Sequence, residues 1–229
     1  MSEYSKYYDE ESERYVARNC YKRIAVSSPR MQNGENPVEF IDSNVQDRLL
    51  PDDIVVLSSV SLAVSQGRFL RTDEITVSRF AGFVARRMGK LASPGRLGSP
   101  EFIEAVYQCC GGFRLFFAWI FGKISARRGD RELFFSIAGN DTEYMRLSEI
   151  GDDGIPVVVY KPLNAERIAM RASEKCGARV AVAIVNPGKK HVVACSDRLL
   201  DYDEIEDILF GKPAEINGKE MPLCIIRAV

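Results

Sequence analysis

The sequence contains very little histidine and none of the common motifs of catalysis. His191 is its only histidine, so no Ser-His-Asp set, Cys-His pair or H-E-x-x-H metal motif can be assembled. Its six cysteines form no C-x-x-C pair, which argues against a Cys/His zinc site. A G-x-x-x-x-G-K-[ST] phosphate loop and a G-x-G-x-x-G dinucleotide motif are also missing. The sequence therefore offers no familiar nucleophile, and no catalytic residue is assigned.

A strong charge of either sign, a targeting segment and a long apolar run are likewise lacking. The formal net charge is −1, and basic pairs such as Arg86-Arg87 are short and scattered, so no nucleic-acid partner is expected. The opening stretch MSEYSKYYDEESERY has no apolar signal core, and a cytoplasmic location is expected. The most apolar stretch, FRLFFAWIFGKI from Phe113 to Ile124, is much shorter than the roughly 20 residues of a membrane span. It predicts a buried helix and no membrane partner.

What the sequence does contain is an alternation of strand-like and helix-like patterns, in a chain that is 46% hydrophobic and 28% charged. This alternation predicts a mixed α/β or α+β protein. The first fifteen or so residues are acidic and tyrosine-rich, without a period, which fits a mobile tail or a short dimer arm, and residues 1–20 are expected to form a flexible tail. Residues 21–229 are expected to form a single unit of two interlocked lobes, approximately 21–150 and 151–229.

Helices are predicted where apolar residues recur at steps of three and four. One spans Val77 to Leu91, and the next is capped by Ser99 and interrupted at Gly111-Gly112. Further helices are predicted in the segments PVEFIDSNVQDRL, AERIAMRASEKC and YDEIEDILF. Strands are predicted in YKRIAVSS, IVVLSSVSLAV, RELFFSIAG, IPVVVY, ARVAVAIV, HVVACS and PLCIIRAV.

Polar turns at the ends of strands are the candidate ligand sites, because α/β proteins commonly bind ligands there. These turns are NGEN at Asn33, SQGR at Ser65, AGND at Ala138 and NPGKK at Asn186. The SQGR turn is either a surface hairpin or the wall of a nucleotide or metal site. Asp141, in AGND, has two interpretations: its carboxylate binds a hard divalent cation, or it closes its own turn.

The order of these motifs resembles that of the coenzyme F-420 γ-glutamyl ligase family, especially its bacterial members. The segments that carry the resemblance are, in chain order, NGENPVEFI, DDIVVLSSVSLAVSQGR, AGND, VVVYKPLNAERIA, VAVAIV and LFGKPAEINGKEMPLCIIR. They span roughly Tyr21 to Arg227, which is most of the chain. Each segment is short, and the resemblance depends on their order and spacing together.

The resemblance implies an α+β ligase-like fold, an intertwined homodimer, and a reaction that consumes GTP or ATP. A substrate carboxylate is phosphorylated, the amine of an amino acid attacks the acyl phosphate, and divalent Mn or Mg bridges the phosphates. By the same resemblance, the nucleotide or substrate would contact the NGEN loop and the SQGR turn, and the metal would contact AGND and NPGKK. The residues so implied are Gly34, Glu35, Ser65, Gly67 and Arg68 for nucleotide or substrate, and Asp141 and Asn186 for the metal.

The sequence departs from the family pattern in two places. Asn186-Pro187 replaces an Asp-Thr or Asp-Ala pair, and asparagine is a neutral ligand for a hard cation. Val60 and Val64 stand where the family has lysines, with Lys123, Lys189 or Lys190 as possible replacements. Two functions remain open: a ligase that acts on a carboxylate other than the F-420 precursor, and a non-catalytic descendant that binds a small ligand or a protein partner.

Overall fold

The computed structural model describes residues 10–16, 19–89, 96–126, 132–149, 155–184, 191–209, 215–216 and 219–228. Its helices and strands confirm the prediction of a mixed α and β protein. The chain forms two compact units, one made of Met1–Gly67 with Pro162–Val229 and the other of Arg68–Lys161. The two interlocked lobes expected from the sequence stay a prediction.

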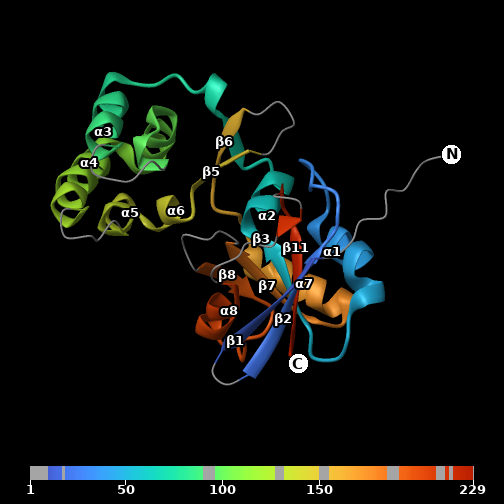
Figure 1. The fold of residues 1–229 in the computed structure, drawn as a ribbon. Coiled ribbons are helices and arrows are strands. Elements are labelled where there is room, and N and C mark those ends of the chain that lie inside the picture. The colour runs from blue at the N-terminus through green and yellow to red at the C-terminus, as the bar shows by residue number, and fades with distance from the viewer. Residues whose placement is uncertain are drawn as a thin grey trace. The chain divides into compact units, whose positions relative to one another are not determined.

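The first unit is built on a six-stranded sheet in the order β1-β2-β11-β3-β7-β8 (Figure 1). Strands β3 and β7 run parallel, and the other neighbours pair antiparallel. β1 pairs with β2, so a strand lies where the sequence predicted only a flexible tail. The strands are β1 (Glu10–Val16), β2 (Asn19–Val26), β3 (Ile54–Ser58), β7 (Arg179–Ile184), β8 (His191–Cys195) and β11 (Leu223–Ala228), with a separate short pair of β9 (Glu215–Ile216) and β10 (Lys219–Glu220).

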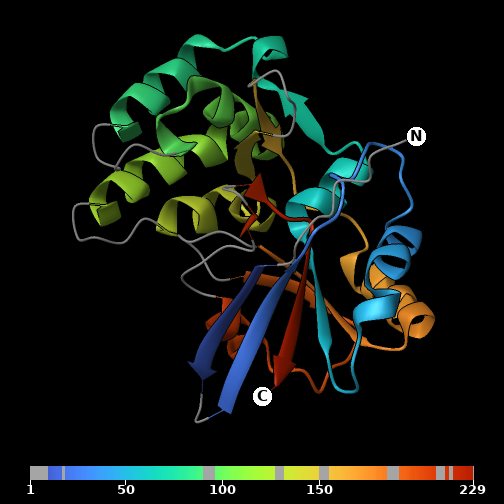
Figure 2. The ribbon, with the colours of Figure 1, turned by 45° about the vertical axis from the view of Figure 1, so that its right-hand side comes forward.

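Both faces of this sheet are buried, which explains why its central strands are apolar throughout. On one face, Val55 and Leu57 pack in a core with α1 (Pro37–Val45) and α7 (Ala165–Cys176). Figure 2 shows these two helices, blue and orange, side by side against the sheet. On the other face, Ile54 and Val56 belong to a second core that includes α8 (Tyr202–Leu209).

A buried ion pair fixes the C-terminal strand in this unit. Asp53 is 1% exposed and accepts hydrogen bonds from Nε of Arg227 at 2.9 Å and from its terminal Nη2 at 2.7 Å. The same carboxylate accepts the backbone N–H of Leu50 at 2.8 Å. The pair therefore joins β11 to the turn that precedes β3.

The predicted strand IVVLSSVSLAV is wrong in its second half. Only Ile54–Ser58 is a strand, and Ser59–Ser65 forms helix α2. A short apolar run is compatible with the two-residue period of a strand and with the 3.6-residue period of a helix. Here a helix buries Leu62 and Ala63. The helix stops at Gly67, whose left-handed φ of 64° and N–H bond to the carbonyl of Val64 are typical of a C-terminal glycine.

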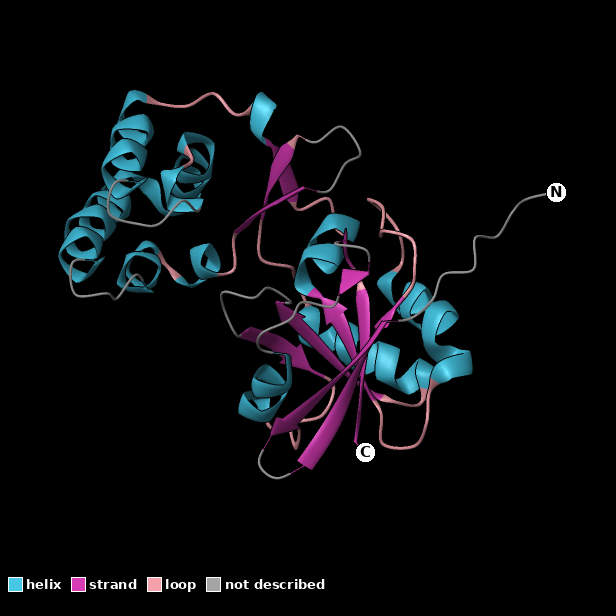
Figure 3. Cartoon of the chain, viewed as in Figure 1, coloured by secondary structure: helices cyan, strands magenta, loops and turns pink. Residues whose placement is uncertain are grey.

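The second unit combines a small antiparallel sheet with a group of helices (Figure 3). The sheet order is β4-β6-β5, and the core lies among the helices and β6. Its strands are β4 (Phe69–Arg71), β5 (Arg146–Glu149) and β6 (Pro156–Val159), and its helices are α3 (Arg79–Gly89), α4 (Pro100–Ala126), α5 (Glu132–Ala138) and α6 (Asn140–Glu143). Short 3₁₀ turns lie at Gln46–Arg48 in the first unit and at Thr72–Glu74 and Arg96–Gly98 in the second.

Helix α4 begins and breaks as predicted. The hydroxyl of Ser99 accepts the N–H of Phe102 at 3.1 Å, and Gly111, with φ 78° and ψ 164°, interrupts the helix. The predicted strand RELFFSIAG is instead helix α5, so Asp141 follows a helix rather than a strand. Phe134 of α5 packs against α4 at Gly122, where an added Cβ would come within 2.9 Å of the phenylalanine Cβ. This packing against α4 favours a helix over a strand for residues 132–138.

The FRLFFAWIFGKI helix is only half buried, which corrects the prediction of a buried helix. Leu115 and Ala118 are fully buried, whereas Phe113 is 80% exposed. The exposed apolar side chains follow helical spacing and form one face of α4, here called the aromatic face: Phe113, Phe116, Phe117, Phe121 and Ile124. Among the described residues, no helix is long and apolar enough to cross a membrane.

Candidate functional site

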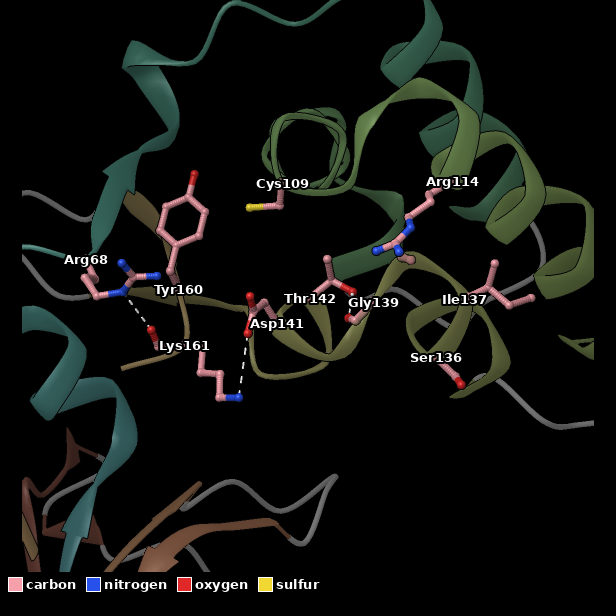
Figure 4. Close-up of a pocket in the computed structure, with 11 residues that line it drawn as sticks. Arg68, Cys109, Arg114, Ser136, Ile137, Gly139, Asp141, Thr142, Tyr160 and Lys161 are labelled. Carbon is pink, nitrogen blue, oxygen red and sulfur yellow. Dashed lines mark hydrogen bonds and ion pairs between the residues drawn. The ribbon is translucent and has the colours of Figure 1, made fainter. Parts of the chain in front are cut away.

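The second unit contains a polar cavity of about 550 Å³ (Figure 4). Its walls come from the ends of β4 and β6, from α4, and from the segment that joins α5 to α6. The lining includes three cationic side chains and one carboxylate. The lining residues are Arg68, Cys109, Arg114, Ser136, Ile137, Ala138, Gly139, Asp141, Thr142, Tyr160 and Lys161.

Strand pairing places one cluster of lining residues. Arg68 precedes β4 and Tyr160-Lys161 follows β6, and the pairing continues past the strands because the N–H of Tyr160 donates to the carbonyl of Arg68 at 3.0 Å. Nε of Arg68 donates in turn to the carbonyl of Lys161 at 2.7 Å. The backbone of one strand thus holds the guanidinium of its neighbour at the cavity wall.

The AGND turn places Asp141. Gly139 has φ 121° and donates its N–H to the carbonyl of Phe135, which ends α5. The hydroxyl and the N–H of Thr142 both donate to the carbonyl of Gly139, at 2.7 and 2.9 Å. The turn is therefore closed by Thr142, and the Asp141 side chain, which is 79% exposed, is left to the cavity.

Asp141 faces a lysine from the end of β6. Nζ of Lys161 lies 3.6 Å from Oδ1 of Asp141 and 4.7 Å from the centre of the Tyr144 ring (Figure 4). A cation over an aromatic face is held by the ring quadrupole. Tyr144 therefore helps to keep the ammonium group beside the carboxylate.

Arg114 enters the cavity from α4, three residues after the break at Gly111. Its guanidinium lies against the AGND turn, and an added Cβ at Gly139 would be 3.5 Å from Nη1. Figure 4 shows the guanidinium directed toward Gly139 and Thr142. An added Cβ at Gly139 would be at ordinary van der Waals distance from this cation, so the two are neighbours without a clash.

The cavity holds two further groups that stay protonated at neutral pH. Burial raises the pKa of the Cys109 thiol above its ordinary value of 9.0; the negative charge of Asp141 adds to this, and Arg68 opposes it. Burial also raises the pKa of Tyr160 to about 12. A thiol and a phenol in these states donate hydrogen bonds and do not act as bases or nucleophiles. The site is suited to binding an anion.

A metal held by protein side chains alone does not fit this cavity. No group of three or more His, Cys, Asp and Glu side chains able to hold a metal is found in the described part of the chain. Asp141 is the single carboxylate of the lining. One or two carboxylates suffice for Mg²⁺ that is bound mainly by phosphate oxygens and water. Asp141 therefore fits a metal that arrives with a nucleotide.

The other predicted site residues lie in the first unit. The N–H of Gly34 donates to the carbonyl of Ser65 at 2.8 Å, and the Asn33 side chain lies against Gly67, where an added Cβ would be 2.9 Å from Oδ1. Glu35 closes the NGEN loop by accepting the N–H of Gln32 at 2.9 Å. The structure thus brings the NGEN loop and the SQGR turn together, while Arg68 lines the cavity of the second unit. Asn186 lies outside the described residues.

Several cavity residues were not predicted from the sequence: Arg114, Cys109, Tyr160 and Lys161. For Arg114, the one signal in the sequence is the helix break at Gly111-Gly112, which precedes it by two residues. Lys123, suggested as a replacement for the missing lysines, does not line the cavity. Lys189 and Lys190 lie outside the described residues.

The structure defines a mixed α and β protein with a cationic cavity in its second unit. A family model described as F420-0:Gamma-glutamyl ligase matches residues 25–113 of the chain. This match supports the family assignment made from the sequence, and it covers less than half of the 229 residues. No curated protein matches the chain.

Proposed function

We propose that the protein is an NTP- and divalent-metal-dependent amide ligase of the γ-glutamyl type. It activates a carboxylate as an acyl phosphate and joins it to the amine of an amino acid, with GTP or ATP as cosubstrate. The family match supports a ligase function. The observation that carries the proposal is the cavity lined by Arg68, Arg114 and Lys161 around the single carboxylate Asp141.

The charges of the cavity suit phosphoryl transfer, which depends on positioning and charge neutralisation more than on covalent chemistry. Arg68 and Arg114 would bind and orient anionic oxygens, and Lys161 would do the same beside Asp141. A Mn or Mg ion, with Asp141 as its protein ligand, would neutralise phosphate charge when bound. Tyr160, which stays protonated, would donate a hydrogen bond.

The overall reaction balances with the groups named. A carboxylate oxygen of the substrate attacks the terminal phosphorus of the nucleotide, and the nucleoside diphosphate leaves. The amine nitrogen of the amino acid then attacks the acyl carbon, the amide bond forms, and phosphate and a proton are released. No residue is assigned as a general base in either step.

The departures from the family pattern favour a substrate other than the F-420 precursor. Val60 and Val64 lie in α2, and Val64 is 5% exposed. Because valine is uncharged, neither position contributes positive charge. The positive charge of the cavity comes from other residues. Because the positive charges stand at other positions than in the family pattern, we expect the substrate to be a different carboxylic acid.

The alternative is a non-catalytic descendant that binds a small ligand or a protein partner. The Asp141–Lys161 pair favours this alternative, because a carboxylate already neutralised by an ammonium group has less need of a metal. A homodimeric state and a cytoplasmic location belong to the proposal in either case.

The proposal is tested by incubating the protein with GTP or ATP, Mn²⁺ or Mg²⁺, glutamate and a panel of carboxylic acids. Release of nucleoside diphosphate that depends on one acid, with a product heavier by the amino acid minus water, is expected. Hydroxylamine should trap the acyl phosphate as a hydroxamate. Nucleotide binding without release under any acid would leave the non-catalytic alternative.

A further inference from the structure

We infer that the first unit contains a second ligand site, which binds a small primary amine with an apolar body. The site is a cavity of about 200 Å³ lined by α8 and by the sheet. It shares no described residue with the cationic cavity of the second unit. The inference is independent of the ligase function, because it concerns another cavity and a ligand of the opposite charge.

Strand register brings the sheet side of this cavity together. Tyr21 of β2 pairs with Ala228 of β11. Ile54 of β3 pairs with Ile226 of β11 on one side and with Arg179 of β7 on the other. All five residues line the cavity. The site therefore lies at the edge of the sheet where β2, β3 and β7 begin and β11 ends (Figure 1).

The base of the cavity is aliphatic. Its most buried lining side chains, each 9% exposed or less, are Ile54, Leu200, Ile205, Ile208 and Ile226. Small-molecule sites in proteins are mostly apolar, with a few polar groups that fix the orientation of the ligand. A volume of about 200 Å³ equals that of about seven water molecules, so a ligand of roughly seven to ten non-hydrogen atoms fits.

The opening of the cavity is acidic. Its charged lining residues are Asp52, Asp201, Glu204 and Arg179, so carboxylates outnumber cations three to one in the described lining. The two aspartates are exposed and Glu204 is half-buried, which places the carboxylates at the opening rather than at the base. An ammonium group carries three N–H donors and no acceptor, so several carboxylates can bind it at once. The charge therefore favours a cationic end on the ligand.

Two of the three carboxylates are held in position by the protein. Oε1 of Glu204 accepts the hydroxyl of Tyr21 at 2.5 Å. Oδ1 of Asp201 accepts the N–H of Asp203 at 2.9 Å, at the start of α8. Within the described ranges, the second oxygen of each carboxylate makes no hydrogen bond. A group that is already ordered loses less side-chain entropy when a ligand binds, which favours binding.

Asp52 is the third carboxylate, and its side chain makes no hydrogen bond or ion pair with a described residue. Arg179 is anchored to the backbone instead, because its Nη2 donates to the carbonyl of Asp52 at 2.7 Å. In the described part of the chain, no ion pair joins Arg179 to any of the three carboxylates. The carboxylate of Asp52 is therefore open to a ligand.

The test is isothermal titration calorimetry of the full chain with phenethylamine and, separately, hexylamine. Phenethyl alcohol is the uncharged probe of the same shape. Saturable binding of at least one amine is expected, and the alcohol should bind about tenfold more weakly or not at all, because it brings no charge to the carboxylates. Higher salt should weaken the binding of the amine. Tighter binding of phenethylamine would assign an aromatic body to the ligand, and tighter binding of hexylamine an aliphatic one.

Two variants locate the binding. Asp52→Asn should weaken amine binding about threefold or more, because one charged partner is lost. It should leave the melting temperature unchanged, since Asp52 has φ 69°, which asparagine adopts readily. Ala228→Trp should abolish binding, because Ala228 is exposed and lines the cavity, so the larger side chain would fill the opening without entering the core.

Asp47→Asn is the matched control, because Asp47 is an exposed aspartate of the same unit that does not line the cavity. It should bind both amines as the wild type does. The inference is overturned if neither amine binds, or if phenethyl alcohol binds as tightly as phenethylamine. It is also overturned if Asp52→Asn and Ala228→Trp bind the amines as the wild type does.

Discussion

The Lys161 ammonium group lies 3.6 Å from Oδ1 of Asp141 and is held over the ring of Tyr144. Asp141 is 79% exposed, so its substitution by asparagine should change the melting temperature very little; exposed pairs are worth about 0–1 kcal/mol. The same change should abolish nucleotide binding that depends on Mn or Mg. Differential scanning fluorimetry with and without nucleotide and metal measures both effects.

Lys161→Met is the companion variant for this pair. It removes a cation that would bind anionic oxygens of the nucleotide and leaves the Asp141 carboxylate in place, so metal-dependent nucleotide binding should be weakened but not lost. Unchanged nucleotide binding in Asp141→Asn would show that Asp141 is a turn residue and not a metal ligand.

Gly139→Ala should destabilise the protein by about 1–3 kcal/mol, because φ 121° with ψ 154° is a conformation that only glycine adopts readily. The new methyl group would lie 3.5 Å from Nη1 of Arg114, an ordinary van der Waals distance, so the cost comes from the backbone conformation. Urea unfolding measures the change in the free energy of unfolding. Gly82→Ala in α3 is the control, and it should be neutral or stabilising by up to about 1 kcal/mol.

Alkaline pH should destabilise the protein partly through Cys224. Burial raises the pKa of this thiol from 9.0 to about 12, so its contribution to stability is complete below pH 9 and is lost as pH rises toward 12. The unfolded thiol ionises in that window and the folded one does not, which costs about 1 kcal/mol at pH 10.

Cys224→Ala lacks this linkage, and it is compared with the wild type by urea unfolding at pH 8 and pH 10 in reducing buffer. The wild type should lose more stability than the variant between the two pH values, by about 1 kcal/mol. Equal losses would mean that Cys224 is ionised in the folded protein at pH 10.

The aromatic face of α4 is proposed as the seam of the homodimer. An apolar face of this kind on a helix that is apolar all round is typical of an interaction surface. The wild type should therefore sediment as a dimer at micromolar concentration. Phe117→Asp should sediment as a monomer with a similar melting temperature, since the side chain is 38% exposed.

Leu199→Asp is the control for this prediction, because Leu199 is 91% exposed and lies in the other unit. It should leave the dimer intact. A wild-type protein that sediments only as a monomer would rule out the seam.

Much of the fold follows from the sequence, and two of the failures, helices α2 and α5, have a common physical cause. The helix at 37–45, the break at Gly111 and the strand at 223–228 were predicted because caps, glycines and a clear period mark them. Helices α2 and α5 were not predicted, because each is only seven residues long and its apolar pattern fits the period of a strand as well as that of a helix. Their packing decides the outcome, as at Phe134 and Gly122.

The site was only partly predictable for a related reason. Asp141 and Arg68 stand in recognisable turns, but the bond that joins Arg68 to Lys161 links residues 93 positions apart. Arg114 carries no local signal of its role beyond the glycines that precede it. A cavity of this kind is assembled by strand pairing and helix packing, and no local pattern records it.

The most direct test of the ligase proposal is a thermal-shift matrix of GTP and ATP, each with and without Mn²⁺ or Mg²⁺. A ligand that binds only the folded state stabilises it by about 2.7 kcal/mol at a hundredfold excess over its dissociation constant, so true binding is readily seen. The largest shift is expected with one nucleotide and a metal together, and this shift should be lost in Asp141→Asn. No shift with either nucleotide under any condition would contradict the ligase proposal and leave the non-catalytic alternative.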